Sequence, residues 1–298
     1  MTPYYQLGQG AEMDISKVKE YGLKILARED SIPLVIMHGS RGDEYGFVHD
    51  KSDYDVTVLT TDKEMLERNK IDWGELKVKI GGHVHPNLTV FVAEGANIGA
   101  GFSYYSKETF DQKFRNQDLE TRILNFVESK PILDKRGIYN EIREETIKEF
   151  EANRQELLRK NFSNCKHLLY DKLRNDIDIY EKTHDIDLLR FNKAADELAN
   201  KMIYARCMLK HIPRSSHTSL SGKRKENILK AIGMSNNYTW KMQAGPAEHG
   251  VIPVKNLKRV YDNLIKEIFE VYGMCKKEFG EGFENVRLNQ ILRENEVP

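Results

Sequence analysis

The stretch from residue 32 to residue 60 is IPLVIMHGSRGDEYGFVHDKSDYDVTVLT, and it predicts two strands joined by a turn and a loop. Residues 32–37 form a short apolar run, partly β-branched and soon followed by Gly39, which is typical of a buried strand. The segment 54–60 alternates and is rich in valine and threonine, so it predicts a second strand. The glycines and charged residues between 41 and 52 favour a turn and a loop.

Two aspartates stand at the beginning of the second predicted strand. Asp53 and Asp55 are two residues apart, so on a strand they lie on the same face. Neighbouring carboxylates repel each other unless positive charge neutralises them, and a pair of divalent cations does so. Oxygen ligands beside a phosphate-bearing substrate are those that Mg²⁺ prefers. The spacing therefore predicts a site for Mg²⁺, or Mn²⁺, at these aspartates.

The turn after the first strand carries groups that suit a phosphate. Gly39 lets the backbone approach a phosphate closely, and Ser40 offers a hydroxyl and an N–H to phosphate oxygens. Arg41 can reach a triphosphate. A Gly-Ser turn or an Asp-x-Asp pair alone is common in unrelated proteins. Here the Gly-Ser turn precedes the Asp-x-Asp pair, and each lies next to a predicted strand. This arrangement favours a nucleotide site.

The residues His38-Gly-Ser-Arg-Gly and Lys51-Ser-Asp-Tyr-Asp-Val56 resemble the signature of the polymerase-β-like nucleotidyltransferase superfamily. They are especially similar to the predicted bacterial and phage nucleotidyltransferases with Gly-Ser-Arg followed by Ser-Asp-Tyr-Asp. The resemblance covers residues 38–60 and implies an enzyme that moves an NMP from an NTP to an acceptor hydroxyl, with ATP as the expected NTP. It implies that Gly39 and Ser40 hold the phosphates and that Asp53 and Asp55 bind the metals.

The superfamily also has a third carboxylate on a later strand. Asp72 lies in Lys70-Ile71-Asp72-Trp73, an apolar–Asp–apolar pattern that fits this position, and Glu75 is the alternative. If the strand at 88–92 is instead the third strand, Thr89 stands at the acidic position. A missing third carboxylate favours a non-catalytic nucleotide-binding regulatory protein.

The composition changes along the chain from about residue 109, where β-branched runs give way to Glu, Lys, Asn and Leu. A helix is predicted at 12–29, before the first strand, and another at 62–69, after the second strand. The later part of the chain contains four predicted amphipathic helices, at 141–182, 186–210, 224–232 and 254–279. We expect an α+β protein with two domains, 1–140 and 141–298. The resemblance implies a nucleotidyltransferase fold for the first, with a small mixed sheet flanked by helices, and the second is predicted to be α-helical.

The acceptor of the predicted transfer is left open by the sequence. Lys and Arg number 46, as do Asp and Glu, and a net charge of zero argues against a surface wrapped in nucleic acid. A local group of cations favours an RNA 3′ end, such as that of tRNA, although a solvated loop explains it equally well. The group consists of Arg206, Lys210, His211, Arg214, Lys223, Arg224 and Lys225. A protein side-chain hydroxyl and an aminoglycoside-type small molecule are the alternative acceptors.

Other features narrow the class of protein. No apolar stretch is long enough to span a membrane, the first residues lack the basic and apolar regions typical of a signal peptide, and we expect no membrane partner. Three cysteines without a CxxC pair indicate buried thiols in a reducing, cytoplasmic compartment. His83 and His85 are two residues apart, but polar loop histidines explain them better than a metal site.

Overall fold

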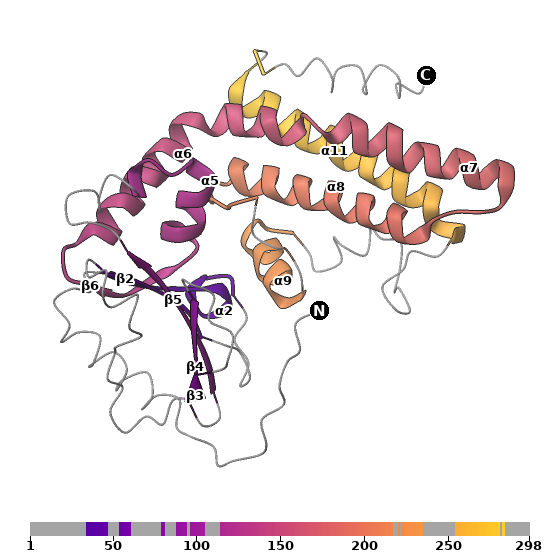
Figure 1. Cartoon of the computed structure of the whole chain (residues 1–298). Helices are drawn as coiled ribbons and strands as arrows, with labels where there is room; N and C mark the ends of the chain where they lie inside the picture. The colour runs from indigo at the N-terminus through magenta and orange to yellow at the C-terminus, as the bar shows by residue number, and fades with distance from the viewer. Residues whose placement is uncertain are drawn as a thin grey trace. The chain divides into compact units, whose positions relative to one another are not determined.

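The computed structural model describes residues 34–46, 54–60, 79–80, 88–93, 96–104, 114–216, 220, 222–234, 254–280 and 282–283, with backbone alone for 40, 41 and the strands between 54 and 104. The chain divides into two compact units, 1–147 and 148–298. Helix α6, Ile138–Phe162, begins in the first unit and ends in the second. The first unit contains the sheet and the second is helical, so the predicted α+β class is confirmed (Figure 1).

The first unit is built on a six-stranded sheet with the order β3-β4-β5-β2-β1-β6. Its strands are β1 (Leu34–His38), β2 (Tyr54–Thr60), β3 (Lys79–Ile80), β4 (Leu88–Ala93), β5 (Ala96–Tyr104) and β6 (Lys130–Asp134). Strand β2 pairs antiparallel with β1 and parallel with β5. The sheet is therefore mixed, as the sequence predicts.

Strands β5 and β6 of the sheet are not predicted from the sequence. Strand β5 contains glycine and alanine where a strand usually has β-branched residues, so its local preference for a strand is weak. Pairing with β2 on one side and β4 on the other stabilises it. Strand β6 contains Pro131, which is tolerated there because β6 is an edge strand. The predicted strands at 32–37, 54–60 and 88–92 correspond to β1, β2 and β4.

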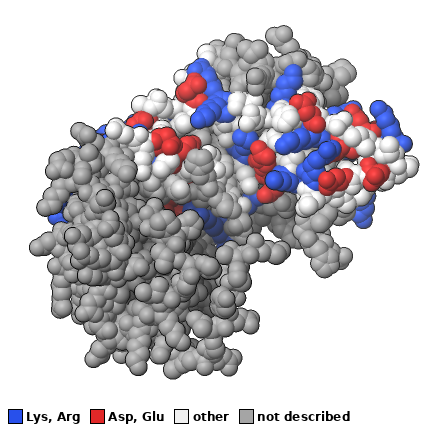
Figure 2. Space-filling model, viewed as in Figure 1, with Lys and Arg blue, Asp and Glu red and all other residues white. Residues whose placement is uncertain are grey.

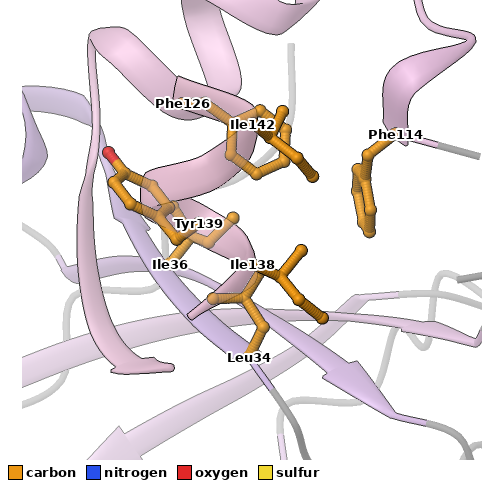
Figure 3. Packing of buried hydrophobic residues seen from close by; sticks show 7 residues of the cluster. All are labelled: Leu34, Ile36, Phe114, Phe126, Ile138, Tyr139 and Ile142. Carbon is orange, nitrogen blue, oxygen red and sulfur yellow. The ribbon is translucent and has the colours of Figure 1, made fainter. Parts of the chain in front are cut away.

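One face of β1 packs against the helices that precede and follow β6. Leu34 and Ile36 form a buried cluster with aromatic and aliphatic residues from these helices (Figure 3). Its other members are Phe114, Phe126, Ile138, Tyr139 and Ile142. The rings of Phe114 and Phe126 meet edge to face with centroids 5.3 Å apart. The cluster thus anchors one face of β1 in the hydrophobic core.

Short helical turns lead into β6. Helix α5 (Leu119–Arg122) starts at Asp118, whose side chain accepts a hydrogen bond from the N–H of Thr121 at 3.0 Å. It continues into the π-helix η1 (Ile123–Val127). The hydroxyl of Tyr139 in α6 donates to the carbonyl oxygen of Ser129 at 2.7 Å, which links α6 to the turn before β6.

The described residues of the second unit are mainly helical. Their helices are the end of α6, the π-helix η2 (His167–Arg174), α7 (Asn175–Thr183), α8 (Leu188–Leu209), α9 (Gly222–Ala231), the 3₁₀ turn η4 (Val254–Asn256) and α11 (Leu257–Phe279). Helices α8 and α11 lie side by side, and η2 contacts both (Figure 1). Among the helices of the described residues, none has the length and apolar composition needed to cross a membrane.

The helix predicted at 141–182 is divided in the structure. Helix α6 ends at Phe162, and the Ser163 hydroxyl donates to the carbonyl oxygen of Lys160 at 2.7 Å. Such a side-chain bond competes with the helical backbone bonds, so the interruption has a local cause. The helices predicted at 186–210, 224–232 and 254–279 correspond to α8, α9 and α11. Those at 12–29 and 62–69 lie outside the described residues.

The three cysteines are free and buried, as the sequence indicates. Burial raises the pKa of the Cys165 thiol to about 12, and it has the same effect on Cys275. These thiols are protonated at neutral pH, and a protonated thiol is a poor nucleophile.

A buried ion pair joins α8 to α11. The guanidinium of Arg206 donates to Glu267 Oε1 and to Glu270 Oε1, each at 2.7 Å. Arg206 and Glu267 are both buried, whereas Glu270 is largely exposed. Because a buried charge is costly without its partner, this contact fixes how the two helices pack.

We expect Arg206→Ala to lower the free energy of unfolding by about 3–5 kcal/mol, because the substitution leaves the Glu267 carboxylate buried without its partner. Chemical denaturation followed by circular dichroism measures this loss. The control is Lys223→Ala, which removes an exposed pair with Glu226 and should cost less than about 1 kcal/mol. Equal losses in the two variants would contradict a structural role for the buried pair.

Candidate functional site

The chain reverses direction directly after β1. Gly39 has a φ of +65°, a conformation that glycine adopts readily and other residues rarely. It begins the single-turn helix α2 (Gly39–Gly42), which lies against β1 and β2. The N–H of Asp43 closes this turn by donating to the carbonyl oxygen of Gly39 at 3.1 Å. The predicted phosphate-binding residues 39–41 are thus part of a tight turn at the end of β1.

Gly42 has no space for a side chain. A Cβ atom at this position would lie 2.1 Å from the carbonyl oxygen of Met37 and 2.7 Å from its carbonyl carbon. The backbone of the turn therefore packs directly on the backbone of β1. The sequence shows Gly42 as part of the motif, but this close approach becomes visible only in the structure.

Hydrogen bonds to Asp43 stabilise the loop that follows the turn. Its side chain is buried, and Oδ1 accepts a hydrogen bond from the N–H of Tyr45 at 3.1 Å. Its carbonyl oxygen accepts from the N–H of Gly46 at 3.0 Å. An aspartate that bonds to the backbone two residues ahead forms an Asx turn, which sets the direction of the chain. Reasoning from the sequence did not identify this carboxylate.

The sheet register brings the two halves of the motif together. His38, the last residue of β1, is the Cα partner of Asp55 in β2. On its other side, Asp55 is paired with Gly99 of β5. Gly39 follows His38 directly, so the turn and Asp55 occupy the same end of the β1–β2 pair.

His38 is a polar residue at the end of an apolar strand. The four preceding residues of β1 are buried, and His38 itself is half-buried. Its side chain makes no hydrogen bond that caps α2. Burial lowers the pKa of His38 to about 4, so the imidazole is neutral at pH 7.

Five residues considered from the sequence lie outside the described residues: Asp53, Asp72, Glu75, His83 and His85. Their placement therefore stays a prediction. Of Asp55, Ser40 and Arg41, the structure describes the backbone.

The strands next to Asp55 limit where a third carboxylate can come from. Between Asp55 and Leu59, β2 is paired with β1 on one side and β5 on the other, so a strand carrying Asp72 does not pair with it there. Strands β4 and β5 contain no aspartate or glutamate. Thr89 of β4 is opposite Ala100 of β5. A third carboxylate therefore has to reach Asp55 from outside these two strands.

The cations between 206 and 225 do not form a free basic surface. Arg206 is buried against glutamates of α11, and Lys225 is buried with its ammonium group 3.1 Å from Asp196. Lys223 pairs with Glu226 at 2.7 Å.

Other members of the group are also in contact with the protein. The His211 ring contacts Glu151 and the guanidinium of Arg154, and Arg214 is buried. Figure 2 shows acidic and basic side chains interspersed on the visible face of the helical unit. The interpretation of this group as a basic patch is wrong for the buried members, because folding pairs or buries them.

Comparisons with known proteins include a distant similarity to a solved structure. No family model matches the chain, and no curated protein matches it. Among solved structures, it is similar to a nucleotidyltransferase-like protein from Exiguobacterium sibiricum, with 10% sequence identity and a TM-score of 0.36, over 95% of this chain and 81% of that chain. A similarity at this level assigns neither fold nor function, so the interpretation of the site rests on the residues described above.

We expect Gly42→Ala to destabilise the first unit by roughly 1–3 kcal/mol, because its methyl group would collide with the Met37 carbonyl. The control is Gly273→Ala in α11, where a Cβ atom meets nothing within 4 Å. This control should gain about 0.5–1 kcal/mol, since alanine favours a helix more than glycine does. Urea denaturation compares the two variants with the wild type, and a neutral Gly42→Ala would disprove the close packing of the turn.

We expect the stability of the chain to fall between pH 7.5 and pH 5 partly through His38. Its pKa is lowered from 6.5 to about 4, so the folded state binds fewer protons than the unfolded state in this range. The contribution is fully present above pH 6.5 and decreases by about 2 kcal/mol by pH 5.

The measurement is the free energy of unfolding at the two pH values, with a metal chelator present, for the wild type and for His38→Gln. The variant lacks the titrating group, so its stability should decrease by about 2 kcal/mol less over the same interval. The same pH dependence in both proteins would show that His38 is accessible to protons in the folded state.

Proposed function

We propose that this protein is a nucleotidyltransferase, which moves an NMP from an NTP to an acceptor hydroxyl with release of pyrophosphate. The observation that supports this proposal is the sheet register, in which His38 is opposite Asp55 and is followed at once by the Gly39 turn. A phosphate-binding turn and an acidic strand are thereby adjacent. Transfer of a nucleotidyl group requires both, one for the triphosphate and one for its metal ions.

In this proposal the turn holds the triphosphate. The left-handed conformation of Gly39 leaves its backbone free of a side chain where a phosphate can approach. Ser40 donates from its N–H and its hydroxyl, and Arg41 pairs with phosphate oxygens. Binding the triphosphate here orients the α-phosphate for attack in line with the leaving pyrophosphate.

Asp53, Asp55 and Asp72 provide the acidic side of the proposed site. Their oxygens suit Mg²⁺ or Mn²⁺, and the neutral His38 opposite Asp55 brings no positive charge that would compete with a cation. Bound divalent ions supply positive charge for the attacking oxygen and the pyrophosphate. Asp72 accepts the proton of the acceptor hydroxyl, with Glu75 as the alternative residue.

The acceptor remains the least constrained part of the proposal. An RNA 3′ end, for example of tRNA, is our first choice, but the buried cations of the 206–225 group no longer support it. A protein hydroxyl and an aminoglycoside-type hydroxyl are the alternatives. RNA as the acceptor would give binding that weakens steeply with salt, and binding that does not depend on salt would count against it.

A second candidate function is a nucleotide-binding regulatory protein without catalysis. The absence of aspartate and glutamate from β4 and β5 favours it, since neither strand supplies the third carboxylate. In this case the turn and Asp55 still hold a nucleotide, but no base activates an acceptor. Both functions predict nucleotide binding, but only the first predicts transfer of an NMP to an acceptor.

The test is transfer of label from α-labelled NTPs in Mg²⁺ or Mn²⁺ to a mixture of RNA, protein and aminoglycosides. We expect transfer by the wild type and a loss of at least about 100-fold in Asp53→Asn and Asp55→Asn, because the isosteric amides remove the metal-binding charge. Asp72→Asn and Glu75→Gln identify the third carboxylate.

The control is Asp171→Asn, which makes the same chemical change at an exposed residue of η2 and should leave transfer unchanged. Transfer that persists in a protein with both Asp53→Asn and Asp55→Asn would refute the proposed nucleotidyltransferase function. Nucleotide binding without transfer to any acceptor would establish the regulatory function instead.

A further inference from the structure

His38 is the residue of β1 that departs from the apolar pattern of the strand. Leu34, Val35, Ile36 and Met37 are all buried, and the strand then ends in an imidazole. A histidine at this place has to satisfy its ring nitrogens in a half-buried position. Its side chain does not cap α2, although its backbone forms the N-cap of that helix. The ring therefore has a different role from the helix cap that its position suggests.

The register gives the imidazole a specific neighbour. His38 is directly opposite Asp55, and residues directly opposite in an antiparallel pair have Cβ atoms roughly 4.5–5.5 Å apart. This separation is short enough for an imidazole N–H to reach a carboxylate oxygen. The position on the far side of Asp55 is Gly99 of β5, which has no side chain. Of the two residues directly opposite Asp55, His38 is thus the one whose side chain can form a hydrogen bond.

A neutral donor suits a carboxylate that has to bind a cation. Carboxylates that ligate metals are held in place by hydrogen bonds from surrounding groups, and losing such a bond weakens metal affinity. A lysine or arginine would orient the carboxylate too, but its charge would repel the divalent ion. His38 can supply such a bond from its position directly opposite Asp55.

We propose that His38 is a positioning residue, whose imidazole N–H holds the Asp55 carboxylate in the orientation that binds a divalent cation. This inference rests on the proposed nucleotidyltransferase function, in which Asp55 is a metal ligand. His38 acts through Asp55 and does not itself touch the substrate. The same bond fixes the end of β1 next to the turn that receives the triphosphate.

The experiment measures binding of Mn²⁺ to the full chain by electron paramagnetic resonance of the free ion, alone and with α,β-methylene-ATP. We compare the wild type with His38→Leu, His38→Asn and His38→Gln at pH 7.5. The expected result is a loss of affinity of about tenfold or more in His38→Leu. One of the two amide variants should recover most of the affinity, because Asn places its N–H near Nδ1 and Gln places it near Nε2.

A second measurement separates positioning from stability. In an Asp55→Asn background, His38→Leu should cause no further loss of Mn²⁺ affinity, since the residue it orients has been removed. Urea denaturation at pH 7.5 identifies any variant that is not folded. If His38→Leu is unfolded, the two amide variants decide, and equal losses in both overturn the proposal.

The outcomes distinguish this inference from the function on which it rests. Wild-type affinity for Mn²⁺ in a folded His38→Leu overturns the positioning role and leaves the proposed function intact. Affinity that is unchanged in Asp55→Asn, or no Mn²⁺ binding by the wild type with the nucleotide, overturns the proposed function itself.

Discussion

The backbone of the turn after β1 packs on the backbone of the strand it leaves, because Gly42 faces the carbonyl group of Met37 with no space for a side chain. Gly39 makes this possible with its left-handed conformation, and the N–H of Asp43 closes the turn on the Gly39 carbonyl. The antiparallel register of β1 and β2 independently fixes Asp55 opposite His38. Strand β1 is common to both constraints, so the placement of the turn beside the acidic strand depends on how firmly β1 is held.

The hydrophobic core explains why β1 is a firm support. Leu34 and Ile36 are buried among residues of η1 and α6, and Val35 and Met37 are buried as well (Figure 3). Apolar side chains on both faces hold the strand in the core, and the polar residues begin only where the strand ends. His38 is the boundary between the hydrophobic core and the candidate site, because it ends the buried strand and is itself only half-buried.

The sequence predicts those parts of the fold whose preference is local, and fails where pairing or tertiary contacts override it. Strands β1 and β2 have apolar or β-branched patterns that stand out alone, as do the long helices α8 and α11. Strand β5 is rich in glycine and alanine and forms because it has partners on both sides. Arg206 belongs to a group of cations along the chain, but Glu267 and Glu270, which are distant in sequence, pair with it.

The candidate site shows the same division. The Gly39 turn and Asp55 are identifiable from their order and spacing, and the register of β1 and β2 puts their backbones at the same end of the strand pair. The close packing of Gly42, the Asx turn at Asp43 and the burial of His38 required a structure, because each depends on distances that the sequence does not contain. Asp72 has no pattern beyond its apolar neighbours, and it stays a prediction.

The edge strand β6 has a consequence for the behaviour of the protein at high concentration. An exposed sheet edge can template the addition of a strand from another molecule and so start aggregation. In β6, Pro131 lacks an N–H, and the neighbouring Lys130 places an exposed positive charge on the strand. Both features disfavour intermolecular strand addition at this edge. Pro131, which makes β6 hard to predict from the sequence, thus also disfavours self-association at this edge of the sheet.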